Sequence, residues 1–356
     1  MPVSVLFSPL RLRKLELANR IVVSPMCQYE AEDGRAVAWH LVHYGQLSMG
    51  GAGLMFVEAT AVTREGRISR HCLGLYDDAC MAALERVVRF CRRYGTAKLA
   101  IQLGHAGRKG SAHRPRDGGA PLKPEEGAWT TLAPSPIPYD EGWPVPKAMD
   151  AEDLARTKTA FVRAAERARD LGFDLLEIHM AHGYLLHQFL SPLSNRRTDT
   201  YGGDLRGRMR WPLQVFEAVR EVWPEERPLG VRISATDWVE GGWDVEDSLA
   251  LAEALKQRGC DFVDVSSGGL DPRPKIPLRP GYQVPFAERI RREVGISVIA
   301  VGLITGPRQA EAIVAEGRAD LVALARGFMD DPHWGWHAAR GGLAGGGSRA
   351  PAVSAP

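Results

Sequence analysis

The stretch Gly172-Phe173-Asp174-Leu175-Leu176-Glu177-Ile178-His179-Met180-Ala181-His182-Gly183-Tyr184 decides how this chain folds. Its first half is a short apolar run after a glycine, which is typical of a buried strand in a parallel sheet. Its second half places His179, His182 and Tyr184 at the carboxyl end of that strand. One irregular turn would aim both imidazoles into one space, where two neutral rings can donate hydrogen bonds to a single oxygen. Because a nearby tyrosine can supply a proton, the stretch predicts a site that polarises a carbonyl and protonates the carbon beside it.

The same alternation of a short apolar run with an amphipathic stretch recurs along the whole chain. The predicted strands are residues 21–25, 54–59, 98–102, 173–176, 229–234, 262–266, 297–301 and 320–324. Helices are predicted over 39–49, 81–94, 151–171 with Asp150 as N-cap, 205–222, 245–258, 284–294 and 308–316, and near Pro332. Eight strands that alternate with helices indicate an α/β fold, the (β/α)8 TIM barrel. The alternative, an open doubly wound sheet, would have a glycine-rich turn directly after its first strand, and Ser24-Pro25-Met26-Cys27 stands there instead.

The barrel is predicted to be a single domain over residues 1–340. An insertion after the third strand, at about 104–149, is rich in glycine and proline and is expected to cap one end of the barrel. Loops of this length are usually functional. Residues 341–356 are mostly Gly, Ala, Ser and Pro, so we expect this tail to be flexible.

Composition argues against several classes of partner. The 356 residues are 45% hydrophobic and 25% charged, with a formal net charge of +2, as in an ordinary globular protein. Since no long run of like charge occurs, neither nucleic acid nor an anionic membrane is indicated as a partner. No apolar stretch reaches the roughly 18 residues that span a bilayer, and the first twenty residues lack the apolar region of a signal peptide. Five scattered cysteines without a CxxC pair suit reduced thiols, so we expect a cytoplasmic protein.

The ends of the predicted strands carry polar or small residues, and chemistry in this fold takes place where strands end. Gln102 ends the third strand, and Arg232 lies inside the fifth, where its burial requires an anionic or electron-rich partner. Small residues end the last three strands, so that backbone N–H groups can approach an anion. In barrels, the loops after strands seven and eight form phosphate sites, and Arg326 would add charge there. The pattern suggests a phosphorylated planar cofactor.

These residues stand in segments that resemble the Old Yellow Enzyme family of FMN-dependent ene-reductases over nearly the whole chain. The subgroup that the chain resembles contains the bacterial thermophilic-type enzymes and xenobiotic reductase. The matching segments are SPMCQY at 24–29, VEATA at 57–61, QLGHAGRK at 102–109, HMAHGY at 179–184, SPLSN at 191–195, VRIS at 231–234 and VG at 301–302.

The resemblance implies a role for each matched residue. The isoalloxazine ring would be held by Ser24, Pro25, Met26, Cys27, Ala59, Gln102 and Arg232, and the FMN phosphate by Gly302, Ala325 and Arg326. Tyr29, His179 and His182 would bind the substrate oxygen, Tyr184 would be the proton donor, and Cys27 would tune the flavin potential. The implied reaction is ping-pong. NADPH or NADH reduces FMN, and hydride then passes to the β-carbon of an α,β-unsaturated carbonyl, an enone, while Tyr184 protonates the α-carbon; nitro compounds are a further substrate class.

The resemblance also bears on assembly and leaves other functions open. We expect a homodimer or homotetramer. In relatives, an arginine or aromatic residue near the C-terminus reaches into the active site of a neighbouring subunit. In this chain, Arg349 is the only charged residue after Arg340. The resemblance implies no metal. Because an HxxH pair at a strand end is compatible with zinc, however, one alternative is a metal-dependent barrel lyase or hydrolase. Another alternative is a flavin-binding sensor without turnover.

Overall fold

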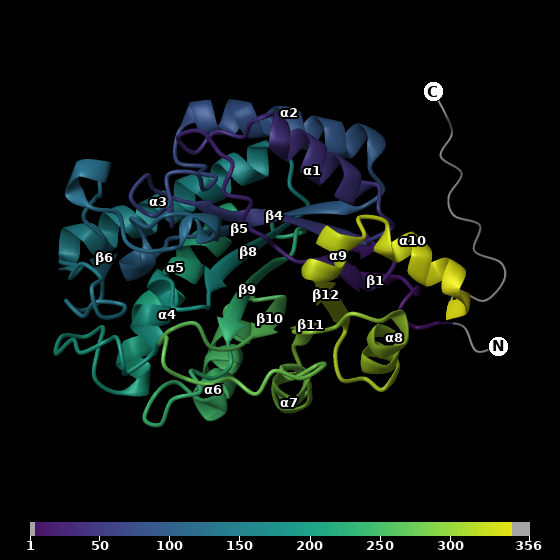
Figure 1. Cartoon of the computed structure of the whole chain (residues 1–356). Helices are drawn as coiled ribbons and strands as arrows, with labels where there is room; N and C mark the ends of the chain where they lie inside the picture. The colour runs from purple at the N-terminus through teal and green to yellow at the C-terminus, as the bar shows by residue number, and fades with distance from the viewer. Residues whose placement is uncertain (1–3, 344–356) are drawn as a thin grey trace.

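Eight parallel strands close into a barrel in this computed structural model, which describes residues 4–343 (Figure 1). In barrel order the strands are β3 (Ile21–Val23), β4 (Leu54–Ala61), β5 (Lys98–Gly104), β8 (Leu175–Met180), β9 (Leu229–Ser234), β10 (Phe262–Ser266), β11 (Ser297–Val301) and β12 (Leu321–Leu324). The predicted TIM barrel is confirmed, and the open-sheet alternative is wrong because β12 pairs with β3 and closes the ring.

Helices surround the barrel, as Figure 1 shows. They are α1 (Ala38–Ser48), α2 (Asp78–Tyr94), α3 (Ala151–Asp170), α5 (Leu205–Val222), α6 (Val245–Lys256), α7 (Val284–Val294) and α8 (Pro307–Ala315), followed by the short α9 (Arg326–Asp330) and α10 (Trp334–Ala338). Each barrel strand is buried on both faces, because its side chains alternate between the lumen and the helices. In β8, Leu175 belongs to the lumen cluster, whereas Leu176 and Ile178 pack in the larger core beneath the helices.

Local sequence signals set the ends of the helices. The side chains of Asp77, Asp150, Asp204 and Asp244 each accept a hydrogen bond from a backbone N–H in the first turn of the helix that follows. The cap at Asp77 makes α2 begin at Asp78, three residues earlier than predicted. The left-handed Gly295, with φ 66°, ends α7.

A hairpin that the sequence did not predict closes the amino end of the barrel. It consists of β1 (Leu10–Leu12) and β2 (Leu15–Leu17), which pair antiparallel. Its inward leucines, Leu12, Leu15 and Leu17, pack in one cluster with residues that begin the barrel strands, Leu54 and Leu321 among them. The hairpin therefore fills the barrel at the end opposite to the strand ends singled out above.

The chain after β8 also differs from the prediction. The short, fully buried helix α4 (Leu185–Leu190) directly follows Tyr184, where no helix was predicted. Strands β4 and β5 are two residues longer than predicted, and β4 has an irregularity between Val57 and Ala59. Each of these differences lies at the carboxyl end of the barrel.

The insertion between β5 and α3 has little regular secondary structure. Between β5 and α3 the chain forms 3-10 turns, at Gly107–Lys109, Pro115–Asp117 and Pro124–Glu126, and a pair of two-residue strands, β6 (Leu132–Ala133) and β7 (Lys147–Ala148). Residues Ala339–Leu343 form a π-helix, so the predicted tail boundary at 341 is two residues inside an ordered element. Residues 344–356, including Arg349, lie outside the described residues. None of the helices in the described part has the length and apolar character needed to cross a membrane.

Candidate active site

The loop after β8 holds the two histidines in a conformation that few residues adopt. His182 has φ 57° and Gly183 has φ 72°, both in the left-handed region. The His182 N–H donates to the Ser234 hydroxyl at 2.9 Å, and the Gly183 N–H donates to Nδ1 of His187 at 2.9 Å. A Cβ at Gly183 would lie 2.2 Å from the backbone oxygen of Gly269. Only glycine fits there, so the motif requires its Gly183.

His179 and His182 are neutral and lie in contact. Nε2 of His179 is 3.3 Å from Nδ1 of His182, and the rings are nearly perpendicular at 83°. Nδ1 of His179 accepts the Ala181 N–H at 3.1 Å, so the proton of this ring is on Nε2. Burial, and then the nearby charge of Arg232, holds the pKa of both rings well below the usual value. The two rings therefore meet at the end of β8 as neutral groups.

The second ring reaches an external oxygen through a change of tautomer. In this structure the two imidazoles face each other rather than one outside point, and Nε2 of His182 is 2.7 Å from the Ser266 hydroxyl. A hydroxyl can donate as well as accept. The Ser266 hydroxyl lies 3.3 Å from Oε1 of Gln283, to which it can donate. If it donates to Nε2 of His182 instead, the His182 proton lies on Nδ1, and both rings then offer an N–H to the space between them.

Tyr184 stands against the first histidine with its proton retained. Its ring meets that of His179 edge-on, with centroids 4.9 Å apart. Burial raises the pKa of Tyr184 far above its usual value, so the phenol stays protonated at any working pH. Such a group can donate a proton when a negative charge develops beside it.

Lys109 ties the loops around Tyr184 together, a role that the sequence analysis missed. Its Nζ donates to the backbone oxygens of His182 and Gly269, both at 2.9 Å, and lies 5.2 Å from the Tyr184 ring centroid. Burial lowers the pKa of Lys109 to about 8. The residue belongs to the QLGHAGRK segment, whose position after the third strand was the only signal that could have indicated it.

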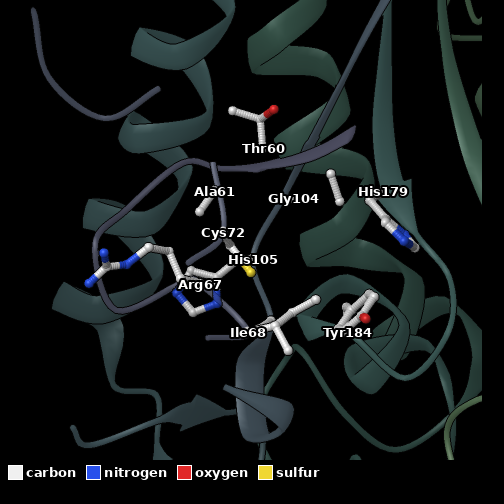
Figure 2. A pocket seen from close by; sticks show the side chains of 12 residues that line it. Thr60, Ala61, Arg67, Ile68, Cys72, Gly104, His105, His179 and Tyr184 are labelled. Carbon is white, nitrogen blue, oxygen red and sulfur yellow. The ribbon is translucent and has the colours of Figure 1, made fainter. Parts of the chain in front are cut away.

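His179 and Tyr184 border a pocket at the mouth of the barrel (Figure 2). His179 and Tyr184 lie on one side of it, and Arg67 and His105 on the other. Ala59, whose site role was predicted, and Cys72, which was not, also line the cavity. Cys72 comes from the loop after β4, which gave no sequence signal.

Cys27 and Tyr29 follow β3, as predicted from the SPMCQY segment. Both are half-buried, and Tyr29 has φ 56°. Burial raises the pKa of the Cys27 thiol well above its usual value, although a hydrogen bond with Tyr29 opposes the shift. The thiol is therefore neutral, and the structure links it to the tyrosine that was expected beside the substrate. Pro25 and Met26, also half-buried, connect this pair to the barrel.

Arg232 occupies the centre of the barrel, where the sequence placed it. Its Nη1 is 3.2 Å from the Ser24 hydroxyl, and its Nε is 3.3 Å from a carboxylate oxygen of Asp264. Gln102 donates to Glu177 at 2.7 Å in the same layer. The anionic partner that burial of Arg232 required is thus Asp264, a residue that the sequence analysis did not single out.

Comparison with known proteins agrees with this geometry. The profile of the NADH:flavin oxidoreductase / NADH oxidase family matches residues 5–342. This chain belongs to that family. It is 48% identical over 339 residues to an NADPH dehydrogenase of Geobacillus thermodenitrificans, covering 95% of this chain and 94% of that one. An NADPH dehydrogenase of Listeria innocua is 45% identical, with 94% of each chain covered.

Solved structures of the family share the architecture. Morphinone reductase superposes with a TM-score of 0.79 at 29% identity, covering 95% of this chain and 90% of that one. A 2-naphthoyl-CoA reductase gives 0.84 over 95% of this chain and 52% of that one, but at 22% identity it shows the fold alone. The predicted Old Yellow Enzyme relationship is confirmed, and the protein is an NAD(P)H-dependent flavin oxidoreductase with FMN as cofactor.

The residues present fit FMN. At the barrel centre the buried guanidinium of Arg232 faces Ser24 through Nη1 and Asp264 through Nε, and a cation at this position suits an electron-rich ring edge. At the rim, Gly302 follows β11 with φ 117°, and Ala325 precedes α9. Arg326, the first residue of α9, is exposed and forms no ion pair with any residue in 4–343. A backbone turn and an unpaired guanidinium are the groups that a phosphate requires.

The metal alternative lacks a third ligand. Among residues 4–343, no group of three or more His, Cys, Asp or Glu side chains is arranged to hold a metal ion. The two histidines of the HxxH pair are within hydrogen-bonding distance of each other instead.

Proposed function

We propose that this flavin oxidoreductase is an ene-reductase that reduces the carbon–carbon double bond of α,β-unsaturated carbonyl compounds. The observation that carries the proposal is the placement of Tyr184, a buried phenol that keeps its proton, edge-on against the neutral ring of His179, which in turn contacts His182. Tyr184 and His179 line one pocket. An oxygen-binding pair beside a proton donor is the equipment that addition of hydride and a proton across such a bond needs.

Each side chain has one task in this reaction. FMN, when bound, would supply the hydride chemistry, linking oxidation of NADPH or NADH to reduction at the β-carbon of the acceptor. His179 and His182 hold the carbonyl oxygen through their N–H groups and stabilise the negative charge that develops on it. Tyr184 gives its proton to the α-carbon, and Tyr29 is a further contact of the substrate oxygen.

The cofactor contacts follow from the same placement. We assign the isoalloxazine ring to Ser24, Pro25, Met26, Cys27, Ala59, Gln102 and Arg232, and the phosphate to Gly302, Ala325 and Arg326. Two buried or half-buried groups support the ring position, the guanidinium at the barrel centre and the neutral thiol after β3. The neutral thiol would adjust how readily the ring is reduced.

An anaerobic titration tests the proposal. The purified protein should lose its flavin absorbance on addition of NADPH or NADH and regain it on addition of 2-cyclohexenone. A saturated ketone, cyclohexanone, is the matched control, because it offers the same oxygen without the double bond. If NADPH bleaches the flavin and neither 2-cyclohexenone nor a nitroalkene restores the absorbance, the protein is not an ene-reductase. The better interpretation is then a flavin-binding sensor that is reduced without turnover.

A further inference from the structure

Two buried carboxyl groups lie beside Arg232, and the proposed reaction gives them no task. Glu177 is on β8 and Asp264 is on β10, on either side of β9, which carries Arg232. Asp264 pairs in register with Arg232, whereas Glu177 pairs with Gly230, two residues earlier. Both carboxyl side chains are fully buried.

Hydrogen bonding in this cluster is incomplete. One Glu177 oxygen accepts from Gln102 at 2.7 Å, and the other has no partner. Neither oxygen of Asp264 has a hydrogen-bond partner, although one is 3.3 Å from Nε of Arg232, and that Nε is also unpartnered. An ionised carboxylate in such surroundings is costly, because nothing replaces the hydration that it lost.

The charges of the cluster do not balance if both acids are ionised. Two carboxylates would face one guanidinium, and the other polar side chains in contact, Ser24 and Gln102, are uncharged. Above the cluster, His179 and His182 are neutral and supply no further positive charge. Burial raises the pKa of both acids, the charge of Asp264 raises the pKa of Glu177 further, and Arg232 favours the ionised forms of both. One cation can balance only one of two buried acids.

We propose that Glu177 and Asp264 together hold a single proton, on one acid or the other and with no hydrogen bond between them, so that the cluster they form with Arg232 carries no net charge. The proton stays within the pair and is not passed to the acceptor, whose proton comes from Tyr184. Its effect is to leave the guanidinium balanced by one negative charge rather than two.

The functional consequence rests on the proposed placement of Arg232 at the flavin ring. Negative charge accumulates at the pyrimidine edge of the ring on reduction, and a doubly ionised pair below would oppose it. A neutral cluster does not. The shared proton would therefore make the bound flavin easier to reduce, and Glu177 and Asp264 would be positioning residues that act through Arg232.

Infrared difference spectroscopy of the oxidised holoenzyme, in H2O and D2O and without any enone, tests the shared proton. We expect a carbonyl stretching band of a protonated carboxyl that shifts in D2O. The band should be lost in Glu177→Gln and also in Asp264→Asn, because each variant leaves one acid, ionised beside Arg232. Glu58→Gln is the matched control: Glu58 is buried on the helix side of β4 and is hydrogen-bonded by Tyr44 and by the Gln28 N–H, so the band should persist. Absence of the band in the wild type, or its survival in both single variants, would overturn the proposal.

The midpoint potential of the bound flavin gives a second, independent readout. Each single amide variant keeps the cluster neutral, so its potential should stay close to that of the wild type, whereas Glu177→Gln/Asp264→Asn leaves an unbalanced cation and should raise it. Equal upward steps in the two single variants would mean that both acids are ionised in the wild type and would refute the shared proton. Since neither measurement uses an enone, a protein with the band but no enone turnover would refute the proposed function alone.

Discussion

Replacement of Tyr184 by phenylalanine tests the proposed proton donor. The variant removes one hydroxyl and keeps the ring, whose edge packs against His179 with centroids 4.9 Å apart. No described residue hydrogen-bonds this hydroxyl, so its removal should change the free energy of unfolding by less than about 1 kcal/mol. A general acid contributes roughly 10²- to 10⁴-fold to the rate of the step it serves, or about 3 to 5 kcal/mol of barrier. We therefore expect oxidation of the reduced flavin by 2-cyclohexenone to slow by that factor.

The reductive half-reaction separates this expectation from general damage. Anaerobic stopped-flow traces of flavin reduction by NADPH should keep their wild-type rate, because no proton from Tyr184 enters that step. Tyr139→Phe is the matched control. The Tyr139 ring centroid also lies close to Lys109, 4.6 Å from its Nζ, but Tyr139 does not line the cavity. Both half-reactions of this variant should keep their wild-type rates. If Tyr184→Phe slows reduction as much as oxidation, or leaves oxidation at the wild-type rate, the assignment of the proton donor is refuted.

Three further predictions concern the surroundings of the site. Gly183→Ala should destabilise the protein by about 2 to 4 kcal/mol in chemical denaturation, because the new Cβ would lie 2.2 Å from a backbone oxygen. The control is Gly203→Ala: Gly203 is also left-handed, but no atom lies near its Cβ position, so this change should cost about 1 to 2 kcal/mol. Equal losses of stability in the two variants would contradict the argument. Lys109→Met should raise the KM for the enone about tenfold, because the His182 carbonyl loses its hydrogen bond from Lys109. In the wild type the KM should rise as pH passes above about 8, where the charge of Lys109 is lost. If neither change affects the KM, Lys109 does not hold the loop of His182 in place for the enone. His43 is buried, and burial lowers its pKa to about 4. Between about pH 6.5 and 4 the unfolded chain therefore binds a proton at His43 that the folded chain does not bind. We expect the free energy of unfolding to fall by up to about 3 kcal/mol as pH is lowered over that range. Thermal melts of His43→Gln should show a shallower loss over that range, and an unaltered profile would show that His43 does not titrate as described.

Much of the barrel could be predicted because its signals are local. Strands β9, β10 and β11 and helices α5 and α7 begin and end at the predicted residues. Each of these strands is mostly apolar and almost wholly buried, although β9 contains Arg232 and β10 contains Asp264. Helix ends were read from single side chains, as with the glycine that ends α7. The resemblance then supplied the site residues, several of which the structure places together at the carboxyl end of the barrel.

What could not be predicted depends on contacts between distant parts of the chain. The three-residue strands β1 and β2 have too few residues for a recognisable period, and only the barrel lumen gives their leucines a place to pack. Helix α4, with six residues, is likewise too short to show helical periodicity, and it is buried on every side. The contacts of Glu177, Asp264 and Lys109 join strands and loops whose separation in sequence hides them, so their roles became visible only in three dimensions.

The hairpin of β1 and β2 has a kinetic consequence. Because its leucines occupy the amino end of the barrel, small molecules can reach the flavin from the opposite end only. Reductant and acceptor would then use the same entrance by turns, and a high concentration of either should obstruct the other. Initial-rate measurements should accordingly give parallel lines in double-reciprocal plots, with inhibition by excess acceptor that added NADPH relieves.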